Sequence, residues 1–219
     1  MTQLTFHDIT KKLQDHEPFQ FARVGDGEML CMDGVKGKNT DGHKYFSDLG
    51  KALRAVYSEK KEYFVGLQPV KHGLHSNTDK YPQDWTNADV LHDASIKGWM
   101  PALFKVLQNR NVIVVGNSRL QKLPFINALI EIPKTNAWTK RNEVWSSIKD
   151  LIENHHDKRL VILFCAGMMS GVMIDEIAKN VGDKVTAIDC GSVFDPYLNY
   201  SSRKYHQQII DRESKLKIV

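Results

Sequence analysis

Leu160-Val-Ile-Leu-Phe-Cys-Ala166 is an unbroken apolar run of strand length, and Asn111-Val-Ile-Val-Val-Gly116 is a second one. Strands that are apolar on both faces are typical of parallel sheets, which carry helices on both sides. Each run is far shorter than the roughly 20 residues that a membrane-spanning helix needs. The two runs therefore predict buried parallel strands of an α/β protein, with no membrane span.

Helix and strand patterns alternate outward from these two runs. In the second half of the chain we expect strands at residues 129–132 and 184–188, and helices at 99–109, after Pro124, at 142–154 and at 170–180. In the first half we expect strands at 19–24 and 63–66, a tight turn at 25–27, and helices at 4–16 (capped by Thr5), 28–32 and 43–58. A chain of 219 residues suits one domain. The expected fold is a single α/β domain with a Rossmann-like, mostly parallel sheet and helices on both faces.

Residues 67–87 interrupt the regular pattern with a stretch rich in Gly, Asn, Asp, His and Pro. Loops of this length are usually functional or mobile, so we expect a mobile active-site loop here. Trp85 is the tryptophan best placed to stack on a sugar, because it lies in this loop. We nevertheless favour packing in the core and at its rim for all four tryptophans, Trp85, Trp99, Trp138 and Trp145.

The composition, 42% apolar and 26% charged, is that of an ordinary globular protein. Three widely spaced cysteines support neither a disulfide framework nor a cysteine zinc site. The N-terminus lacks the pattern of a secretory signal, which favours a cytoplasmic location. A formal charge of +4 and a pI of 8.8 suit an anionic ligand or nucleic acid without requiring either.

Arg23-Val-Gly-Asp-Gly-Glu28 is the most informative of the turns that follow expected strands, because ligands of open parallel sheets bind at the carboxyl ends of the strands. The carboxylates of Asp26 and Glu28 are the kind of ligand that Mg²⁺ or Mn²⁺ prefers, and such an ion would bridge them to a substrate diphosphate. The spacing leaves a structural alternative open. In it, Asp26 caps the helix, the two glycines serve the turn and Arg23 neutralises Glu28.

Three further turns carry candidate residues. Gly116-Asn117-Ser118-Arg119 could hold a phosphate through its backbone and Arg119, or could be an ordinary turn with a solvated arginine. The segment 165–171 could place a nucleotide against a helix N-terminus, although it is not a complete nucleotide-binding motif. Past the last expected strand, Asp189 and Asp195 are each a candidate metal ligand, general base or simple turn residue.

The order of these motifs resembles that of the bacterial and phage glycosyltransferases of the GT-D fold class, formerly a domain of unknown function. Their Arg-Phe-Gly-Asp-Gly-Glu motif differs from residues 23–28 of this chain only at Val24. Their Gly-x-Ser-Arg-like turn is similar to residues 116–119, and their Pro-x-x-Asn-Ala-Trp/Phe segment to residues 133–138. Near the end, a glycine-bearing turn and an Ile-Asp-x-Gly motif are similar to Gly167 and to residues 188–191.

This resemblance implies a UDP-sugar donor and a divalent cation, Mn²⁺ or Mg²⁺, held with the help of Asp26 and Glu28, which would also be catalytic. Asp195 is our hypothesis for the base that deprotonates the acceptor hydroxyl. The residues expected to bind the donor and its phosphates are Arg23, Gly25, Gly27, Asn117, Ser118, Arg119, Gly167, Asp189 and Ser192. The chain departs from the family at residues 168–169, where the family often has Pro-Thr, and at Ser192, where it has His. These departures leave the donor sugar and the role of Ser192 open.

The acceptor expected from the resemblance is a glycan or glycoprotein. A hydroxymethylated base in phage-type DNA is the rival acceptor, which the basic pI favours and which would require base flipping. A metal-dependent phosphohydrolase, or a nucleotide-binding module without transfer activity, is the alternative from a different functional class. The sequence leaves the oligomeric state open, since apolar stripes that pack within a chain look like those that pack between chains.

Overall fold

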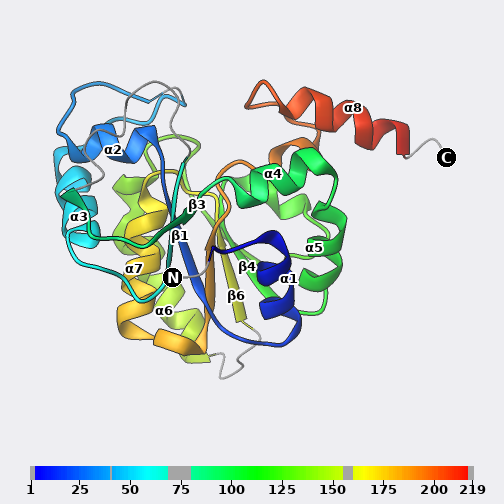
Figure 1. Cartoon of the computed structure of the whole chain (residues 1–219), viewed down its shortest axis with the longest axis horizontal. Coiled ribbons are helices and arrows are strands. Elements are labelled where there is room, and N and C mark those ends of the chain that lie inside the picture. The colour runs from blue at the N-terminus through cyan, green and yellow to red at the C-terminus, as the bar shows by residue number, and fades with distance from the viewer. Residues whose placement is uncertain (1–2, 40, 69–79, 155–159, 217–219) are drawn as a thin grey trace.

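The computed structural model describes residues 3–39, 41–68, 80–154 and 160–216. Within them, seven strands form one sheet in the order β3-β2-β1-β7-β6-β4-β5, and every neighbouring pair is parallel (Figure 1). The strands are β1 Gln20–Val24, β2 Phe64–Leu67, β3 Trp85–Asn87, β4 Asn111–Gly116, β5 Ala128–Glu131, β6 Leu160–Phe164 and β7 Thr186–Asp189. The two apolar runs form the adjacent strands β4 and β6, and every residue of β6 is buried. The expected parallel α/β sheet is confirmed.

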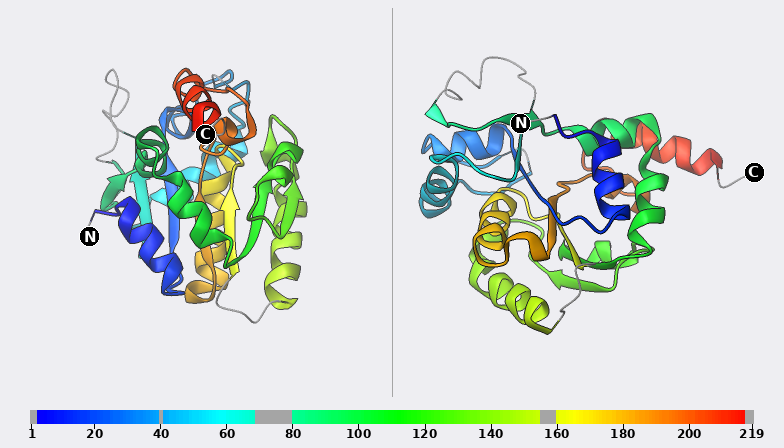
Figure 2. Two further views of the ribbon diagram at one scale, coloured as in Figure 1. Left: turned by 90° about the vertical axis from the view of Figure 1, so that its right-hand side faces the viewer. Right: turned by 60° about the horizontal axis from the view of Figure 1, so that its bottom comes forward.

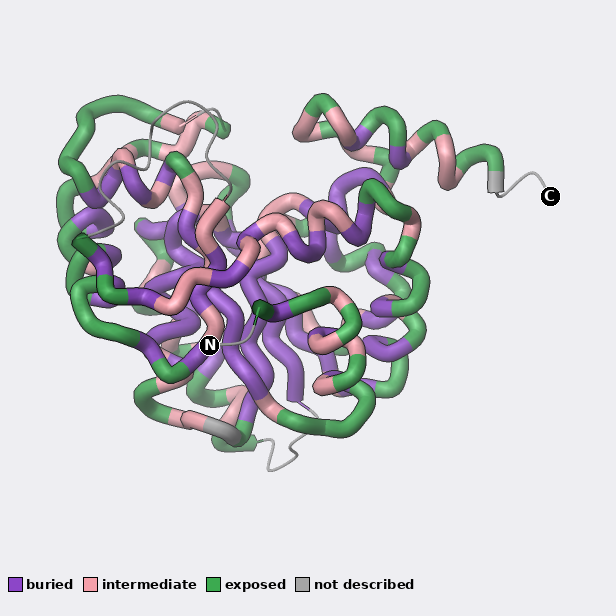
Figure 3. Tube along the Cα trace, in the orientation of Figure 1, coloured by how far each residue is buried: buried purple, intermediate pink, exposed green. Residues whose placement is uncertain are grey.

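Helices cover both faces of the sheet, as the layers in Figure 1 show. One face carries α2 Asp26–Met32, α3 Ser47–Tyr57, α6 Arg141–Asn154 and α7 Met169–Asn180. The other carries α1 Phe6–Gln14, α4 Val90–Lys97 and α5 Met100–Leu107. Helix α8, His206–Leu216, lies above the carboxyl edge of the sheet and extends outward, largely exposed (Figures 2 and 3). Short 3-10 turns are η2 Ser118–Lys122, η3 Ala137–Lys140, η4 Gly182–Lys184 and η5 Asp195–Leu198.

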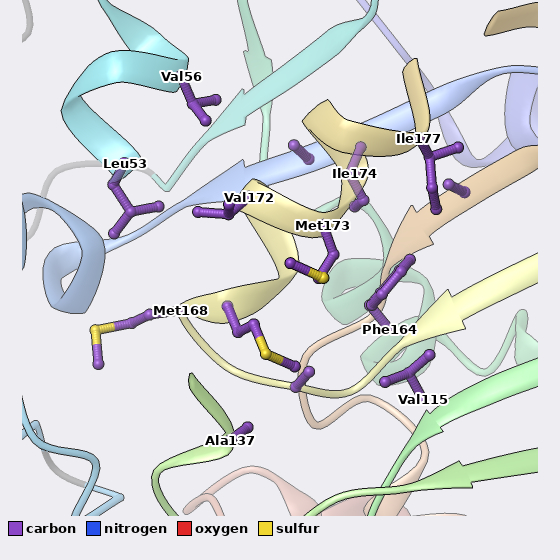
Figure 4. Close-up of a cluster of buried hydrophobic side chains, with 14 of the residues drawn as sticks. Leu53, Val56, Val115, Ala137, Phe164, Met168, Val172, Met173, Ile174 and Ile177 are labelled. Carbon is purple, nitrogen blue, oxygen red and sulfur yellow. The ribbon is translucent and has the colours of Figure 1, made fainter. Parts of the chain in front are cut away.

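Helix α7 is the central helix of its face. Its buried side chains pack between α3 and the strands, with Met173 and Ile174 among them (Figure 4). Gly171 permits the close approach of α3, because a Cβ atom there would lie 2.3 Å from the Tyr57 hydroxyl. This packing fixes the start of α7 beside the carboxyl ends of β1 and β6.

Local signals explain where two helices begin. Helix α1 starts with a capping box in which Thr5 and Asp8 each bind the other's backbone N–H. Helix α3 begins at Ser47 instead of the expected residue 43, because the preceding residues are tied to another loop. Asn136 donates its N–H to His43 Nδ1 (3.0 Å) and accepts the Lys44 N–H on its side-chain oxygen (2.8 Å).

Other expectations are corrected. The helix expected after Pro124 does not form. Instead, η2 ends before Pro124, and Asn127 directly precedes β5, with its side chain accepting the Val112 N–H at 2.7 Å. The expected loop 67–87 contains β3 at its end, so Trp85 is a half-buried strand residue packed against the core. Residues 69–79 of that loop lie outside the described residues. Helices α4 and α8 were not expected.

Candidate active site

The carboxyl ends of β1 and β7 lie side by side, and the chain leaves them in opposite directions. After β1 it continues through α2 and α3 to β2, whereas after β7 it passes into η5, which packs against η2 beyond β4. Such a divergence is where ligands bind in open parallel sheets. The turns singled out in the sequence therefore share one edge of the sheet, because each follows the carboxyl end of a parallel strand.

The Arg-x-Gly-Asp-Gly-Glu turn joins β1 directly to α2. Gly25 is the N-cap residue, and its N–H donates to Glu28 Oε2 at 2.9 Å. Asp26 is the first residue of the helix and is exposed, and its Oδ1 accepts the Gly27 N–H at 2.8 Å. Asp26 therefore does not cap the helix. The two acidic positions are two residues apart, which separates their directions by about 200° around a helix.

The Glu28 carboxylate accepts the Gly25 N–H and is influenced by the charges of Asp189 and Arg23, residues of the adjacent strands β7 and β1. Burial and, second, the charge of Asp189 raise the pKa of Glu28 to about 7, against the opposing effects of the Gly25 N–H and Arg23. Burial raises the pKa of Asp189 to about 6, against the opposing effects of Arg23 and the Gly191 N–H. Two carboxyl groups and one guanidinium thus influence one another at a partly buried site.

Arg23 is held in place from two sides. Its Nη2 lies 3.9 Å from Asp89 Oδ1, and its Nη1 would be 2.5 Å from a Cβ atom at position 191. Gly191 also has φ of +54°, so a glycine is needed there for both reasons. The Nε of Arg23 is buried and has no hydrogen-bond partner among the described residues. It is a donor suited to an anionic ligand.

A second basic group follows β4. Asn117 caps η2 by accepting the Arg119 N–H at 3.2 Å, and the Arg119 guanidinium lies 3.5 Å from the ring centroid of Tyr200. Arg119 Nη2 is 3.6 Å from Asp195 Oδ1, and Ser202 Oγ donates to Asp195 Oδ2 at 2.6 Å. Arg119 Nε, like that of Arg23, is buried and has no hydrogen-bond partner within the described part of the chain.

Asp195 is a buried carboxylate whose pKa is raised by desolvation and lowered by Ser202 and then Arg119. Of the remaining expected residues, Ser118 is exposed and Ser192 is half-buried next to Tyr205. Gly167 has φ of +58°, and a Cβ atom there would lie 3.6 Å from the His43 ring.

Several residues of this edge were not anticipated from the sequence. The ring of His92 stacks on that of Tyr205 at 3.9 Å, and Arg203 pairs with Asp41 through Nη2 and Oδ2 at 2.6 Å. The latter contact joins the loop after α2 to the segment before α8. Tyr205, Arg203 and Asp41 lie in irregular segments without helical or strand periodicity, and His92 lies in α4, a helix that the sequence did not reveal.

A divalent cation would find a partial set of ligands here. Within the described residues, no three His, Cys, Asp or Glu side chains gather into a metal-ligand cluster. Mg²⁺ is commonly held by only one or two carboxylates, with substrate phosphates and water completing its shell. Asp26 and Glu28 are both hard oxygen donors, but each already accepts a backbone N–H and their directions diverge, so they form no preformed cage. They fit an ion that arrives with a diphosphate and completes its shell from phosphate and water.

Fold and site together define an α/β protein with charged groups at the carboxyl edge of a parallel sheet. No protein-family model matches the chain, and no curated protein matches its sequence. Among solved structures, a glycosyltransferase (DUF1792) from Streptococcus sanguinis matches with a TM-score of 0.67 and 16% identity, over 90% of this chain and 83% of that one.

Two further structures of domain of unknown function 1792 match over 90% of this chain and 80% of theirs. One is a selenomethionine-substituted form (TM-score 0.64, 14% identity), and the other is described as having a distinct glycosyltransferase fold (TM-score 0.63, 15% identity). The chain therefore has the glycosyltransferase fold of the DUF1792 proteins, which confirms the GT-D fold expected from the motif order. No helix in the described part of the chain is long and apolar enough to cross a membrane.

Proposed function

We propose that this protein is a metal-dependent glycosyltransferase that moves a sugar from a UDP-sugar to an acceptor hydroxyl. The observation that carries the proposal is the cluster of Arg23, Glu28 and Asp189 where β1 and β7 diverge, in a chain with a glycosyltransferase fold. Charged groups of this kind suit a diphosphate leaving group. The cytoplasmic location stays a prediction.

The two arginines would bind the donor diphosphate. The partnerless Nε atoms of Arg23 and Arg119 supply charge-assisted hydrogen bonds to phosphate oxygens. Negative charge grows on the diphosphate as the sugar leaves, so these donors stabilise the transition state more than the ground state. Asp89 and Tyr200 keep the guanidinium groups oriented, which reduces the ordering cost of binding.

Asp26 and Glu28 would hold a divalent cation, Mn²⁺ or Mg²⁺, which when bound would neutralise the diphosphate further. On the acceptor side, Asp195 would take the proton of the attacking hydroxyl while the bond between the sugar and UDP breaks. A raised pKa makes it a stronger base than an exposed aspartate. The acceptor is a glycan or glycoprotein, and a hydroxylated DNA base is its rival.

Calorimetry of UDP binding tests the donor site. We expect UDP to bind in Mn²⁺, to bind more weakly in EDTA, and to lose its metal dependence in the double variant Asp26→Asn, Glu28→Gln. Circular dichroism checks that the variant is folded. Glu143→Gln is the matched control, because Glu143 is an exposed carboxylate of α6 that pairs only locally, with Lys140.

UDP binding that is absent, or that ignores both the metal and the double variant, would contradict the donor-site assignment. Product analysis then separates the two enzyme classes. Release of UDP with a glycosylated product supports transfer, whereas release of free phosphate without an acceptor product supports the phosphohydrolase.

A further inference from the structure

A groove lies on the outer surface of the helical layer, between α3 and α6 and over α7. Its volume is about 430 Å³, which is within the range of small-ligand sites. Its lining residues come from these three helices and from η3, and they are Asp48, Ala52, Trp138, Arg141, Asn142, Trp145, Val172, Met173 and Glu176. The proposed donor site uses none of them.

One wall of the groove is a fixed polar and aromatic cluster. The Trp138 indole N–H donates to Asp48 Oδ2 at 2.9 Å, and the Arg141 guanidinium lies 4.6 Å from the centroid of the Trp138 ring. Arg141 Nη2 is also 3.8 Å from Asp48 Oδ2. Trp138 is only 6% exposed, so the core holds this wall in place.

The floor and the opposite wall add an apolar surface. Trp145 lies one turn beyond Arg141 on α6, on the same side of the helix, and it is partly exposed while packing against the core. Val172 and Met173 of α7 form the floor, and the position of α7 among the core side chains is visible in Figure 4. Asn142 is exposed at the rim.

This combination matches the chemistry of a sugar ring. A pyranose presents one face of C–H groups, which packs on an aromatic ring, and a rim of hydroxyls that both donate and accept hydrogen bonds. Here an indole can take the apolar face, while carboxylates, a guanidinium and an amide offer acceptors and donors around it. A nucleic acid would be repelled by Asp48 and Glu176, and an amphipathic helix needs a longer apolar surface.

The groove adjoins the carboxyl edge of the sheet. Asp48, Arg141 and Val172 all lie in the first turn of their helices, and α7 and α6 begin just beyond the edge that carries the candidate active site. Trp138 also lines a narrow cavity on its other side, together with His43 and Met168. The groove and this cavity therefore both lie toward the edge of the sheet that carries the candidate active site.

We propose that the groove binds a sugar residue of the acceptor, which makes the acceptor a glycan or a glycan-bearing protein instead of a DNA base. This rests on the proposed glycosyltransferase function. The binding is separable from donor chemistry, because the groove and the charged cluster of Arg23, Glu28 and Asp189 share no residue.

A glycan microarray probed with the full-length protein tests the proposal without any transfer reaction. The wild type and Trp99→Ala should bind the same set of glycans, and Trp145→Ala should bind that set at least about tenfold more weakly, as expected for loss of a stacking ring. Trp99 is the matched control, since it is 49% exposed and lies on the other face of the sheet. UDP binding should be the same in all three proteins.

Asn142→Ala is the second variant, because Asn142 is exposed and its replacement leaves the core intact even if Trp145→Ala unfolds. It should also weaken glycan binding. The proposal is overturned if no glycan on the array is bound, if both folded groove variants bind like the wild type, or if duplex DNA containing hydroxymethylcytosine is bound instead. UDP binding that persists in those cases would leave the proposed donor function standing.

Discussion

Ser202 Oγ donates a hydrogen bond of 2.6 Å to Asp195 Oδ2, while the other oxygen of Asp195 faces Arg119 Nη2 at 3.6 Å. One buried carboxylate therefore contacts both the proposed phosphate-binding arginine and the segment that leads to α8. In the proposed mechanism this contact joins the group that deprotonates the acceptor, Asp195, to the arginine that binds the donor diphosphate. The same contacts suit a second role for Asp195, in which it only orients Arg119.

Asp195→Asn distinguishes these two roles. If Asp195 is the base, kcat on the plateau of the pH profile should fall by about 10²–10⁴-fold, the acidic limb should disappear, and UDP affinity should be retained. If Asp195 only positions Arg119, UDP affinity should fall and the remaining transfer should keep the wild-type pH profile. Steady-state kinetics across pH measures kcat, and calorimetry on the same preparation measures UDP affinity.

Ser202→Ala refines the base hypothesis. The Ser202 hydroxyl stabilises the charged carboxylate, so its loss should raise the pKa of Asp195 further. Because the base must be deprotonated, the acidic limb of the kcat profile should move to higher pH. An unchanged acidic limb in a folded variant would count against Asp195 as the base.

Replacing either glycine of the Arg-x-Gly-Asp-Gly-Glu motif by alanine should affect UDP binding at position 25 but not at position 27. A Cβ atom at Gly25 would lie 2.8 Å from Gln68 Oε1 and 3.2 Å from Glu28 Oε2, so Gly25→Ala should displace Glu28 and weaken metal-dependent UDP binding. At Gly27 the nearest atoms, on Asn39 and Met168, are 3.6 Å away, which is ordinary contact.

Gly27→Ala is therefore the matched control. In a helix, alanine is more favourable than glycine by roughly 0.5–1 kcal/mol, so this variant should be at least as stable as the wild type and should bind UDP normally. Thermal unfolding and calorimetry report the two properties. Equal loss of UDP binding in both variants would mean that any side chain in the turn is harmful, and that Glu28 is not the specific cause.

The fold could be predicted from the sequence wherever one element carries its own signal. The apolar runs of β4 and β6 need no context to be recognised as buried strands, and Thr5 with Asp8 marks the start of α1. By contrast, β3 is only Trp85–Asn87, too short for a periodic pattern, and it forms because β2 offers a parallel edge. Helix α8 has only three apolar residues, Ile209, Ile210 and Leu216, so its apolar stripe is too weak to reveal a packed helix.

The sequence motifs pointed to turns that the structure brings to one edge of the sheet, but the pairings between their residues could not be predicted. Sequence spacing pointed from Glu28 to Asp26, but it gave no sign that the charge of Asp189, a residue of a strand far along the chain, also acts on Glu28. That neighbourhood depends on β1 pairing with β7, and no local pattern encodes strand order. The same holds for Arg119, which meets Tyr200 and Asp195 only after η2 and η5 pack together.

A buried ion cluster away from the site should control stability. Asp175 of α7 is 2% exposed and contacts Lys61 Nζ at 3.0 Å, Lys179 Nζ at 2.6 Å and the Tyr63 hydroxyl at 3.0 Å. Lys61 is itself buried, whereas the Lys179 side chain is 59% exposed. Lys61→Met should lower the free energy of unfolding by on the order of 3 kcal/mol, since it breaks a buried pair.

Lys179→Met removes a charge from the same carboxylate at the surface, so it should cost less than about 1 kcal/mol. Urea unfolding of both variants makes the comparison. An equal loss of unfolding free energy in the two variants would mean that the burial of Lys61 does not make its ion pair with Asp175 stronger. UDP binding should be unchanged in both variants, because neither lysine lies at the carboxyl edge of β1 or β7.

His206 should make the stability of the protein depend on pH. Its ring is fully buried, its Nδ1 accepts the Ser202 N–H at 3.2 Å, and burial, followed by the charges of Arg203 and His92, lowers its pKa to about 4. The folded state therefore keeps the ring neutral between pH 4 and its ordinary pKa of 6.5, while the unfolded chain takes up a proton over that range. The contribution of His206 to the free energy of unfolding should be fully present above pH 6.5 and should be lost as the pH falls toward 4.

In His206→Gln, the free energy of unfolding measured in urea should be lower at neutral pH but should vary less between pH 4.5 and 6.5. A slope equal to that of the wild type would show that carboxylates alone cause the acid sensitivity and that His206 does not contribute.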